Sequence, residues 1–194
     1  MQTCLLCSRI IKQTLTFSEF FLLKNNRNLI CNKCQSLFKK IPNERCPRCS
    51  KANSKGICAD CLKWEEKGII VNHQSIFIYN QAMKDYFSLY KFMGDYRLHE
   101  VFDSYFKNLS KKIPLVPIPV SPKRLQERGF NQVTAFLKDR AYLDLLEKED
   151  TVRQSSLNRE GRLSTSNPFK LKEDEKIPQK IILIDDIYTT GTTF

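Results

Sequence analysis

Eight cysteines constrain this chain more than any other feature of its sequence. All of them lie between Cys4 and Cys61 of a 194-residue chain, in four Cys-x-x-Cys pairs that read CLLC, CNKC, CPRC and CADC. Two thiolates at this spacing can bind one metal ion, and two such pairs complete a tetrahedral zinc site. One pair alone would also suit a redox dithiol. Four pairs so close together favour two structural zinc ions.

The sequence does not settle which pairs share a metal ion. Sequential pairing would join the first two pairs and the last two, and a cross-braced arrangement would use the same spacings. Either way each site is closed by four sulfur atoms, which argues against catalysis by the metal. We expect the module to stabilise the fold; the alternative is a contact surface for protein or nucleic acid. Leu15–Leu23 is expected to form short strand or turn structure over the first metal. The predicted zinc ligands are Cys4, Cys7, Cys31, Cys34, Cys46, Cys49, Cys58 and Cys61.

Composition describes a folded, basic protein. Hydrophobic residues make up 41% of the chain, and 13 Phe with 7 Tyr supply large core side chains. The formal charge of +11 favours nucleic acid, phosphorylated small molecules or anionic lipid as a partner, although it also fits a solvated lysine-rich surface. No apolar run reaches the length of about 18 residues that a transmembrane helix needs, and the start of the chain is too polar for a secretory signal. We therefore expect a cytosolic protein without membrane insertion, in which cysteines bind metal and do not form disulfides.

A change in composition near Gly68 predicts a zinc-binding module at 1–67 and a second domain at 68–194. Ile69–Asn80 is rich in β-branched and aromatic residues and predicts a strand or hairpin arm. Helical spacing then relates Met83, Tyr86, Phe87 and Tyr90, and next Leu98, Val101, Phe102, Tyr105, Phe106 and Leu109. Their aromatic side chains are expected to belong to the core.

The second half of this domain predicts strands that alternate with a helix and a loop. Ile113–Pro122 predicts a strand that ends in a loop, and Lys180–Asp185 predicts a buried strand. Glu147–Lys180 is polar, has little periodicity and is expected to carry a mobile loop. A helix is predicted through Val133, Phe136, Leu137, Ala141 and Leu145. The order favours an α/β domain with a mostly parallel sheet.

In such sheets ligands bind at the carboxyl ends of the strands, which places PVSPKR and DDIYTTGTT at one edge. The small residues of TTGTT let backbone N–H groups and hydroxyls converge on a phosphate. Asp185 and Asp186 would repel that phosphate directly, so they suit sugar hydroxyls or Mg²⁺ beside it. Together these groups describe a site for a ribose 5-phosphate.

The terminal stretch IILIDDIYTTGTT resembles the phosphoribosyl pyrophosphate signature of type I phosphoribosyltransferases. It has four apolar residues, two acids, two further positions and a Thr-Thr-Gly-x-Thr loop. Tyr188 departs from the aliphatic residue that this signature prefers there. The resemblance implies a type I phosphoribosyltransferase-like α/β fold behind the zinc-binding module.

The whole chain resembles the ComF/ComFC family of competence-associated, phosphoribosyltransferase-like proteins. The resemblance rests on the four cysteine pairs followed by YKFMGD, VPIPVSPKRLQERGFNQ, RQSSLNREGRLSTSNPF and IDDIYTTGTT in that order. It implies a cytosolic bacterial factor for uptake and handling of single-stranded DNA in natural transformation. The partners it implies are the ComFA helicase and DprA.

The resemblance also implies roles for individual residues. SPKRLQERGFNQ would be the pyrophosphate-side loop, with Arg124 and Arg128 as cationic donors. RQSSLNREGRLSTSNPF would be a flexible loop over the site that carries Arg153, Arg159 and Arg162 and could contact nucleic acid; these arginines could equally belong to a solvated loop. Guanidinium groups suit phosphate because they bind its oxygens in bidentate fashion. The expected ligands of phosphoribosyl pyrophosphate and its Mg²⁺ are Asp185, Asp186, Thr189, Thr190, Gly191, Thr192 and Thr193, the two acids also being the catalytic candidates.

Family members continue past the phosphate loop into a helix and usually a further strand. Because this chain stops at Phe194, we expect a weakened phosphate site, since a helix amino terminus would add N–H donors. His73 and His99 are isolated and are expected to be structural or surface residues. Two other functions remain open: an active phosphoribosyltransferase with an unknown acceptor, and a zinc-ribbon adaptor that binds protein partners.

Overall fold

The computed structural model of the chain describes residues 2–12, 28–150, 168–173 and 175–189. Its helices are α2 (Asn32–Leu37), α3 (Ala59–Glu66), α4 (Gln81–Lys91), the 3₁₀ helix η1 (Tyr96–Val101), α5 (Asp103–Lys107), α6 (Pro122–Arg128) and α7 (Gln132–Phe136). Its strands are β1 (Gln2–Thr3), β2 (Ile10–Ile11), β3 (Leu115–Pro117), β4 (Leu146–Lys148), β5 (Phe169–Leu171) and β6 (Ile182–Ile184). The chain is therefore a mixed helix and strand protein with short elements. In the part of the chain that is described, no helix is long and apolar enough to cross a membrane.

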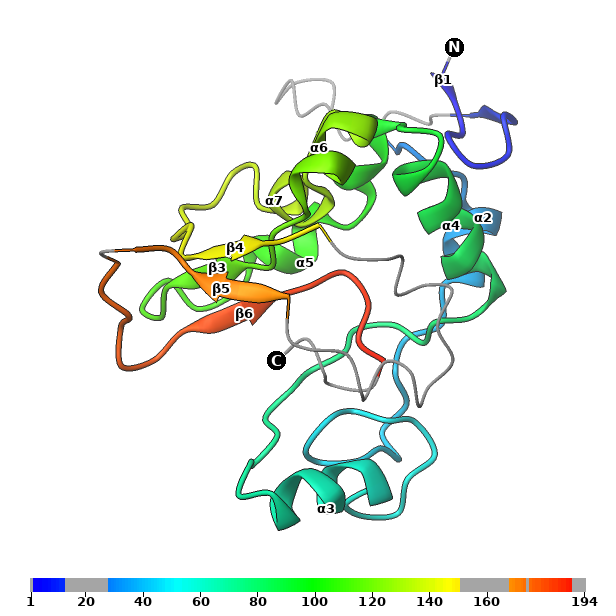
Figure 1. Cartoon of the computed structure of the whole chain (residues 1–194). Helices are drawn as coiled ribbons and strands as arrows, with labels where there is room; N and C mark the ends of the chain where they lie inside the picture. Colours follow the sequence, from blue (N-terminus) through cyan, green and yellow to red (C-terminus); the bar gives the residue numbers. More distant parts are fainter. Residues whose placement is uncertain (1, 13–27, 151–167, 174, 190–194) are drawn as a thin grey trace.

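Strands β3 and β6 pair in parallel and lie together with β4 and β5 at the left of Figure 1. Leu115 lies opposite Ile182, and Pro117 lies opposite Ile184. Two other pairs, β1 with β2 and β4 with β5, are antiparallel. The register of β3 and β6 places their carboxyl ends side by side, as the sequence predicts for the segments that follow them.

Helix α4 has the apolar face that the sequence predicts. Met83, Tyr86, Phe87 and Tyr90 are all buried. The helix begins after Asn80, whose side chain accepts a hydrogen bond from the N–H of Met83 at 3.1 Å, as expected for an N-cap asparagine. The two buried tyrosines keep their hydroxyls paired, because Tyr86 donates to the carbonyl of Leu98 and Tyr90 to that of Gln132, each at 2.9 Å.

The first cysteines belong to the same core as α4. Cys4, Ile30, Cys34 and Phe38 pack in one cluster with the buried face of α4 and with Leu98, Phe102, Ala135 and Phe136. A smaller cluster of Leu115, Val133, Leu137 and Ile184 packs α7 against β3 and β6. The last four cysteines form a separate cluster beside α3, in the lobe that lies below the rest of the chain in Figure 1.

The strand predicted over Ile69–Asn80 is wrong. This stretch is a connection, in which Phe77 makes one isolated bridge with Lys40. Ile69 and Ile70 are exposed. Their β propensity has no effect here, because it reflects packing against a neighbouring strand, and no strand of the described chain pairs with them.

Two predicted helices are shorter than the periodicity indicates. The first is divided at Phe102 into η1 and α5. The second ends at Phe136, and the chain then runs toward β4, so that Leu145 is buried next to a strand and not on a helix. The amide of Leu143 already bonds the carbonyl of Leu115 at 2.8 Å. The apolar spacing that suggested a helix here is a coincidence over a short stretch.

Two loops predicted from the sequence contain regular structure. PKRLQER is helix α6, with Pro122 in its first turn and Gly129 as a left-handed C-cap with φ of 81°, a pattern typical of helix ends. Glu147–Lys180, expected to carry a mobile loop, contains the end of β4 and all of β5, which pair with each other; residues 151–167 and 174 of this stretch lie outside the described residues. The expected strand or turn at Leu15–Leu23 lies outside the described residues.

Candidate functional site

The cysteines form two groups, and sequential pairing is the arrangement found. Within each group the Sγ atoms all lie within 4.8 Å of one another. The first group is Cys4, Cys7, Cys31 and Cys34, and the second is Cys46, Cys49, Cys58 and Cys61. The alternative cross-braced arrangement is therefore excluded.

Both groups have the chemistry that zinc requires. In each, a backbone N–H faces a ligand sulfur: that of Cys31 lies 3.3 Å from Cys4 Sγ, and that of Cys58 lies 3.4 Å from Cys46 Sγ. Burial opposes ionisation of Cys4 and Cys46, but backbone hydrogen bonds outweigh it and lower the pKa of each thiol to about 6. Burial raises the pKa of Cys34, Cys49 and Cys61 instead, so Cys4 and Cys46 are the thiols that ionise most readily. Four convergent sulfurs in each group fit one Zn²⁺ ion per group.

Asp185 and Asp186 lie at the carboxyl end of β6, directly after Ile184. The N–H of Asp186 donates to Asp185 Oδ1 at 2.8 Å. Burial, together with the neighbouring charge of Asp186, raises the pKa of the Asp185 carboxyl to about 7, although this N–H, Lys91 and Lys148 oppose the shift. A carboxyl group that titrates near neutrality is typical of functional sites.

Lys91 is the closest cationic partner of these acids, and the sequence alone did not reveal it. Its Nζ lies 2.7 Å from Asp186 Oδ2, and the two side chains are only 15% and 6% exposed. Lys91 is the last residue of α4 and also lies over the Phe87 ring, 4.7 Å from its centroid. It occurs in the YKFMGD motif, but only the fold brings that motif to Asp186.

Lys148 is a second cation that sequence reasoning missed. It belongs to β4 and covers the Phe169 ring at 4.6 Å. Burial lowers the pKa of its ammonium, Arg124 lowers it further, and Asp185 and Asp186 oppose the shift. The two lysines and the two acids therefore belong to one electrostatic cluster.

The two arginines of α6 are not equivalent: Arg128 lies near Asp186, whereas Arg124 lies near Arg128 and Lys148. Arg128 donates through Nε to the carbonyl of Lys91 at 3.0 Å and through Nη1 to Gln132 Oε1. Burial lowers the pKa of Arg128, and Asp186 is the largest influence that opposes this shift. The positive charge of Arg124 lowers the pKa of Arg128 and of Lys148. Arg128 is thus held by the protein itself, whereas Arg124 has the half-buried position expected of a ligand donor.

Thr189 is exposed and lies three residues beyond Asp186. The other predicted ligands lie outside the described residues, namely Thr190, Gly191, Thr192, Thr193, Arg153, Arg159 and Arg162. We will call the described groups the acid–cation cluster; they are Asp185, Asp186, Lys91, Lys148, Arg124 and Arg128.

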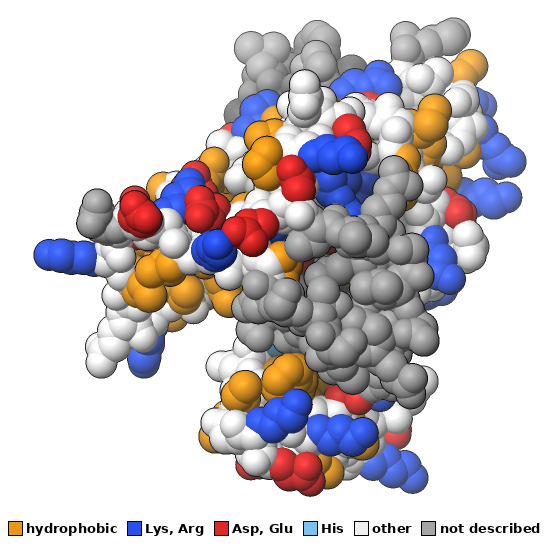
Figure 2. Space-filling view, viewed as in Figure 1, with side chains coloured by type: hydrophobic (Ala, Val, Ile, Leu, Met, Phe, Trp, Pro, Cys, Tyr) orange, Lys and Arg blue, Asp and Glu red, His pale blue; other side chains and the backbone are white. Residues whose placement is uncertain are grey.

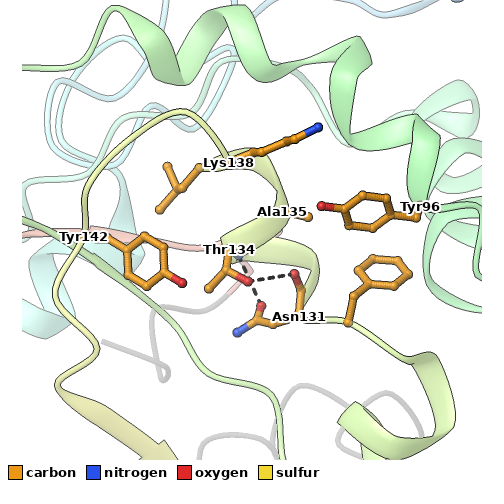
Figure 3. Close-up of a pocket in the computed structure, with 8 residues that line it drawn as sticks. Tyr96, Asn131, Thr134, Ala135, Lys138 and Tyr142 are labelled. Atoms are coloured by element: carbon orange, nitrogen blue, oxygen red, sulfur yellow. Dashed lines mark hydrogen bonds between the residues drawn. The ribbon is translucent and has the colours of Figure 1, made fainter.

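A pocket of about 330 Å³ opens beside α7. Figure 3 shows Tyr96 and Tyr142 on opposite sides of it, with Thr134 and Asn131 between them. Tyr96 also meets the Phe130 ring edge to face at 5.2 Å, and Lys138 completes the polar lining. Phe130 and Asn131 belong to the predicted pyrophosphate-side loop. Tyr96, Thr134, Lys138 and Tyr142 were not predicted as site residues, because only the fold brings them together.

The histidines have structural contacts. His99 is buried and its Nδ1 lies 2.6 Å from the carbonyl of Tyr96. His73 lies 3.1 Å through Nδ1 from the carbonyl of Cys49 and stacks on Tyr188. These contacts agree with the structural roles expected for them.

Replacing Asp185 with Asn is expected to stabilise the protein at pH 8. The carboxyl group has a pKa of about 7 when folded and an ordinary value of 3.8. The folded state therefore retains a proton that the unfolded state has lost, and stability falls as the pH rises from about 4 to 7. The amide introduced by this change has no charge, and its oxygen can still accept a hydrogen bond from the N–H of Asp186.

The expected gain is on the order of 1–3 kcal/mol at pH 8 and should vanish near pH 4. Thermal unfolding across this pH range measures it. The exposed Asp139, which pairs with Lys107 at 3.2 Å, provides the control: Asp139→Asn should have little effect at either pH. A gain that is equal at pH 4 and pH 8 would contradict a raised pKa.

Comparison with known proteins identifies the family. The chain is 48% identical over 195 aligned residues to "Competence protein ComFC" of Streptococcus pneumoniae (strain ATCC BAA-255 / R6), an alignment that covers 98% of this chain and 89% of that protein. It is 36% identical to "Competence protein ComFC" of Bacillus subtilis (strain 168), over 98% of this chain and 84% of that protein. A third relative is "Competence protein F" of Haemophilus influenzae (strain ATCC 51907 / DSM 11121 / KW20 / Rd), at 24% identity over 86% of this chain and 81% of that protein.

No protein-family model matches the chain, and no solved structure matches it. The two ComFC alignments nevertheless extend over nearly all of the sequence, from the cysteine pairs to the terminal acids. This chain belongs to the ComF/ComFC family of competence proteins.

Proposed function

We propose that this chain is a competence factor that binds single-stranded DNA through a phosphate-binding site on a phosphoribosyltransferase-like scaffold. Residues 1–67 would be its zinc-binding module and residues 68–194 its phosphoribosyltransferase-like domain. The names of the relatives support competence, and the acid–cation cluster at the carboxyl ends of parallel strands supports the site. We extend the proposal to a cytosolic location and to ComFA and DprA as partners, as the family resemblance implies.

The observation that carries the proposal is the charge balance of this cluster. Lys91, Lys148 and Arg128 lie near two carboxylates, and Arg124 lies near Lys148 and Arg128. The pKa of the Asp185 carboxyl is raised to about 7, and Asp186 already pairs with Lys91. The remaining positive charge suits the phosphates of a nucleic acid or a phosphorylated sugar. Figure 2 shows Lys and Arg side chains spread over the visible face, so the local cluster is more informative than the net charge.

The pocket beside α7 suits a base of the same nucleic acid. Single-stranded DNA is held by aromatic side chains on which bases stack, together with cations that bind the backbone. Tyr96 and Tyr142 offer two such rings, and Lys138 lies at the same pocket. A base could therefore stack here without sequence preference.

An active phosphoribosyltransferase is the second candidate. It is favoured by the placement of Asp185 and Asp186 at the carboxyl edge of β6, where sugar hydroxyls or Mg²⁺ of phosphoribosyl pyrophosphate would bind. Turnover of phosphoribosyl pyrophosphate in the presence of candidate acceptors distinguishes it from the DNA-binding role.

Replacing Arg124 and Lys148 with Gln is expected to lower the affinity for an unstructured oligonucleotide. The same change is expected to make that affinity less dependent on salt concentration. Each lost phosphate contact reduces the slope of log affinity against log salt by about 0.7 for single strands, so the double variant should have a slope shallower by about 1.4. Arg128 is left unchanged because its bonds to the carbonyl of Lys91 and to Gln132 join α6 to neighbouring segments.

Fluorescence anisotropy with a labelled oligonucleotide over a series of salt concentrations measures the slope. The matched control replaces Arg97 and Lys172 with Gln, because these changes remove the same charge from surface ion pairs with Asp95 and Asp144. The slope of the control variant should differ from the parental slope by less than about 0.7, the change expected for one phosphate contact. If the parental protein does not bind the oligonucleotide at low salt, the proposed function is wrong; an unchanged slope in the double variant places the DNA elsewhere.

A further inference from the structure

The second cysteine group contacts the segment that carries the acids. The ring of Tyr188 stacks on that of His73, with centroids 4.0 Å apart and planes inclined by 21°. Tyr188 and Val71 are also the partly buried hydrophobic residues that pack against Cys46, Cys49, Cys58 and Cys61. Tyr188 lies only two residues after Asp186. The contact between Tyr188 and His73 is therefore made by the chain segment that carries the two acids.

His73 is held firmly by residues of the CPRC pair and its neighbour. Its N–H donates to the carbonyl of Arg48 at 2.8 Å. Its carbonyl accepts from Ser50 Oγ at 3.3 Å, and its ring Nδ1 lies 3.1 Å from the carbonyl of Cys49. Three contacts thus tie His73 to residues 48–50, whose conformation depends on ligation by Cys49.

The segment that carries Asp185 and Asp186 packs against neighbouring clusters both before and after the two acids. Ile184 packs in the strand cluster, and Ile187 packs against the large core that includes α4. Tyr188 then turns to the second cysteine cluster. Asp185 and Asp186 lie between these supports, so their position depends on where Tyr188 is held.

The identity of residue 188 fits this arrangement. The phosphoribosyl pyrophosphate signature prefers an aliphatic residue at this position, and an aliphatic side chain could not stack on an imidazole ring. The tyrosine at this position has an aromatic ring that stacks on the ring of His73.

We propose that Tyr188 and His73 are positioning residues through which the second metal-bound cysteine cluster holds Asp185 and Asp186 in place. Metal binding at the second cluster and ligand binding at the acid–cation cluster are then coupled, and each strengthens the other. The module would thus contribute to the site as well as to the fold. The consequence for ligand binding rests on the proposed function, whereas the positioning itself does not.

Hydrogen–deuterium exchange of the zinc-loaded full chain tests the positioning without any ligand. In Tyr188→Ala, exchange of the peptide that covers 182–189, corrected for intrinsic rates, should rise at least about fivefold, the lower end of ordinary coupling between sites. Replacing Cys46 and Cys58 together with Ser, with loss of one zinc confirmed by metal analysis, should cause the same rise. The peptide that covers β3 should keep its parental exchange in both variants.

Two control variants isolate the stacking contact. Tyr188→Phe retains the ring and should exchange like the parent. Leu62→Ala removes an exposed apolar side chain from α3 in the same lobe and should also leave 182–189 unchanged. Unchanged exchange of 182–189 in Tyr188→Ala, or in the variant that has lost its second zinc, would overturn the proposal.

Binding of an unstructured single-stranded oligonucleotide is then measured on the same variants. Loss of the second zinc and Tyr188→Ala should each lower the affinity at least about fivefold, and Tyr188→Phe should not. If exchange rises but the parental protein binds no oligonucleotide, the positioning is upheld and the proposed function fails. If the parental protein binds and neither exchange nor affinity changes in the variants, the proposed function is upheld and the coupling fails.

Discussion

Cys34→Ser is expected to unfold the whole protein, whereas Cys58→Ser should unfold only the lobe around α3. Cys34 and Cys4 belong to the same large core cluster as Tyr86 and Tyr90. Cys58 belongs to the smaller cluster, which packs with Val71 and Tyr188 alone among the partly buried hydrophobic residues described. The same chemical change should therefore have a global effect at one site and a local effect at the other.

The magnitude follows from the binding of zinc to four thiolates. Structural zinc contributes on the order of 10–16 kcal/mol of apparent binding energy in small zinc-binding peptides, whereas a whole domain is stable by about 5–15 kcal/mol. Loss of the first metal should therefore exceed the stability of the core to which it is bound. Loss of the second should leave that core folded, because its buried side chains do not include Cys46 or Cys58.

Metal analysis and circular dichroism measure this difference. The parental protein should contain two zinc ions per chain, and each Cys variant should contain one or none. Cys58→Ser should retain the near-ultraviolet signal of the aromatic core, and Cys34→Ser should lose it. Ser36→Ala, on the exposed face of α2 next to the first site, should retain both metals and the signal. A Cys34→Ser protein that has lost one zinc and still melts like the parent would refute the structural role of the first site.

Replacing Asp185 and Asp186 together with Asn is expected to abolish measurable binding of phosphoribosyl pyrophosphate with Mg²⁺. Hydrogen bonds to charged groups contribute about 1.5–3 kcal/mol each, so the loss of two should lower the affinity at least about a hundredfold, at about 1.4 kcal/mol per factor of ten. The Asn side chains have nearly the same volume as the acids they replace. The β3–β6 pairing should therefore persist.

The change at Asp186 also affects Lys91. Without the Asp186 carboxylate, the nearly buried ammonium of Lys91 loses the oxygen that lies 2.7 Å from it, and an unpaired buried charge is destabilising. We therefore expect opposite effects of the single changes at pH 8, a gain in stability for Asp185→Asn and a loss for Asp186→Asn. Adding Lys91→Gln to Asp186→Asn should recover part of that loss.

Calorimetry with phosphoribosyl pyrophosphate and Mg²⁺ measures the binding, and thermal unfolding measures stability. Asp139→Asn with Asp144→Asn removes the same charge from exposed surface ion pairs and should bind like the parent. If the parental protein binds and the double variant at 185 and 186 binds equally well, the acids do not contact the ligand. If the parental protein does not bind at all, the phosphoribosyltransferase alternative loses its support.

Some features could be read from the sequence because they depend on local spacing. The cysteine pairs predict both metal-binding groups, since ligands three positions apart are close in any fold. The apolar face of α4 is strictly periodic and is buried as predicted. The strand predicted over Lys180–Asp185 is confirmed as β6, although only Ile184 is buried and Ile182 and Leu183 are half-buried.

Other features were misread where a local pattern had no partner in space. Ile69–Asn80 has the composition of a strand, but no strand of the described chain pairs with it. The predicted helix through Leu145 ends at Phe136, because Leu143 bonds to β3 and the chain then enters β4. The segment expected as a pyrophosphate-side loop contains helix α6, whose ends are marked by Pro122 and Gly129.

By itself, the sequence determined the metal-binding chemistry, the buried face of α4, and the order in which a strand, two acids and a polar turn follow one another. These depend on residues within a few positions of each other, whose relative placement the backbone geometry limits. Only the tertiary structure decided that the cysteine pairs are sequential, that Lys91 binds Asp186, and that Tyr188 stacks on His73. Each of these joins segments that are distant in the sequence, and such contacts are selected by the packing of the whole chain and not by any local pattern.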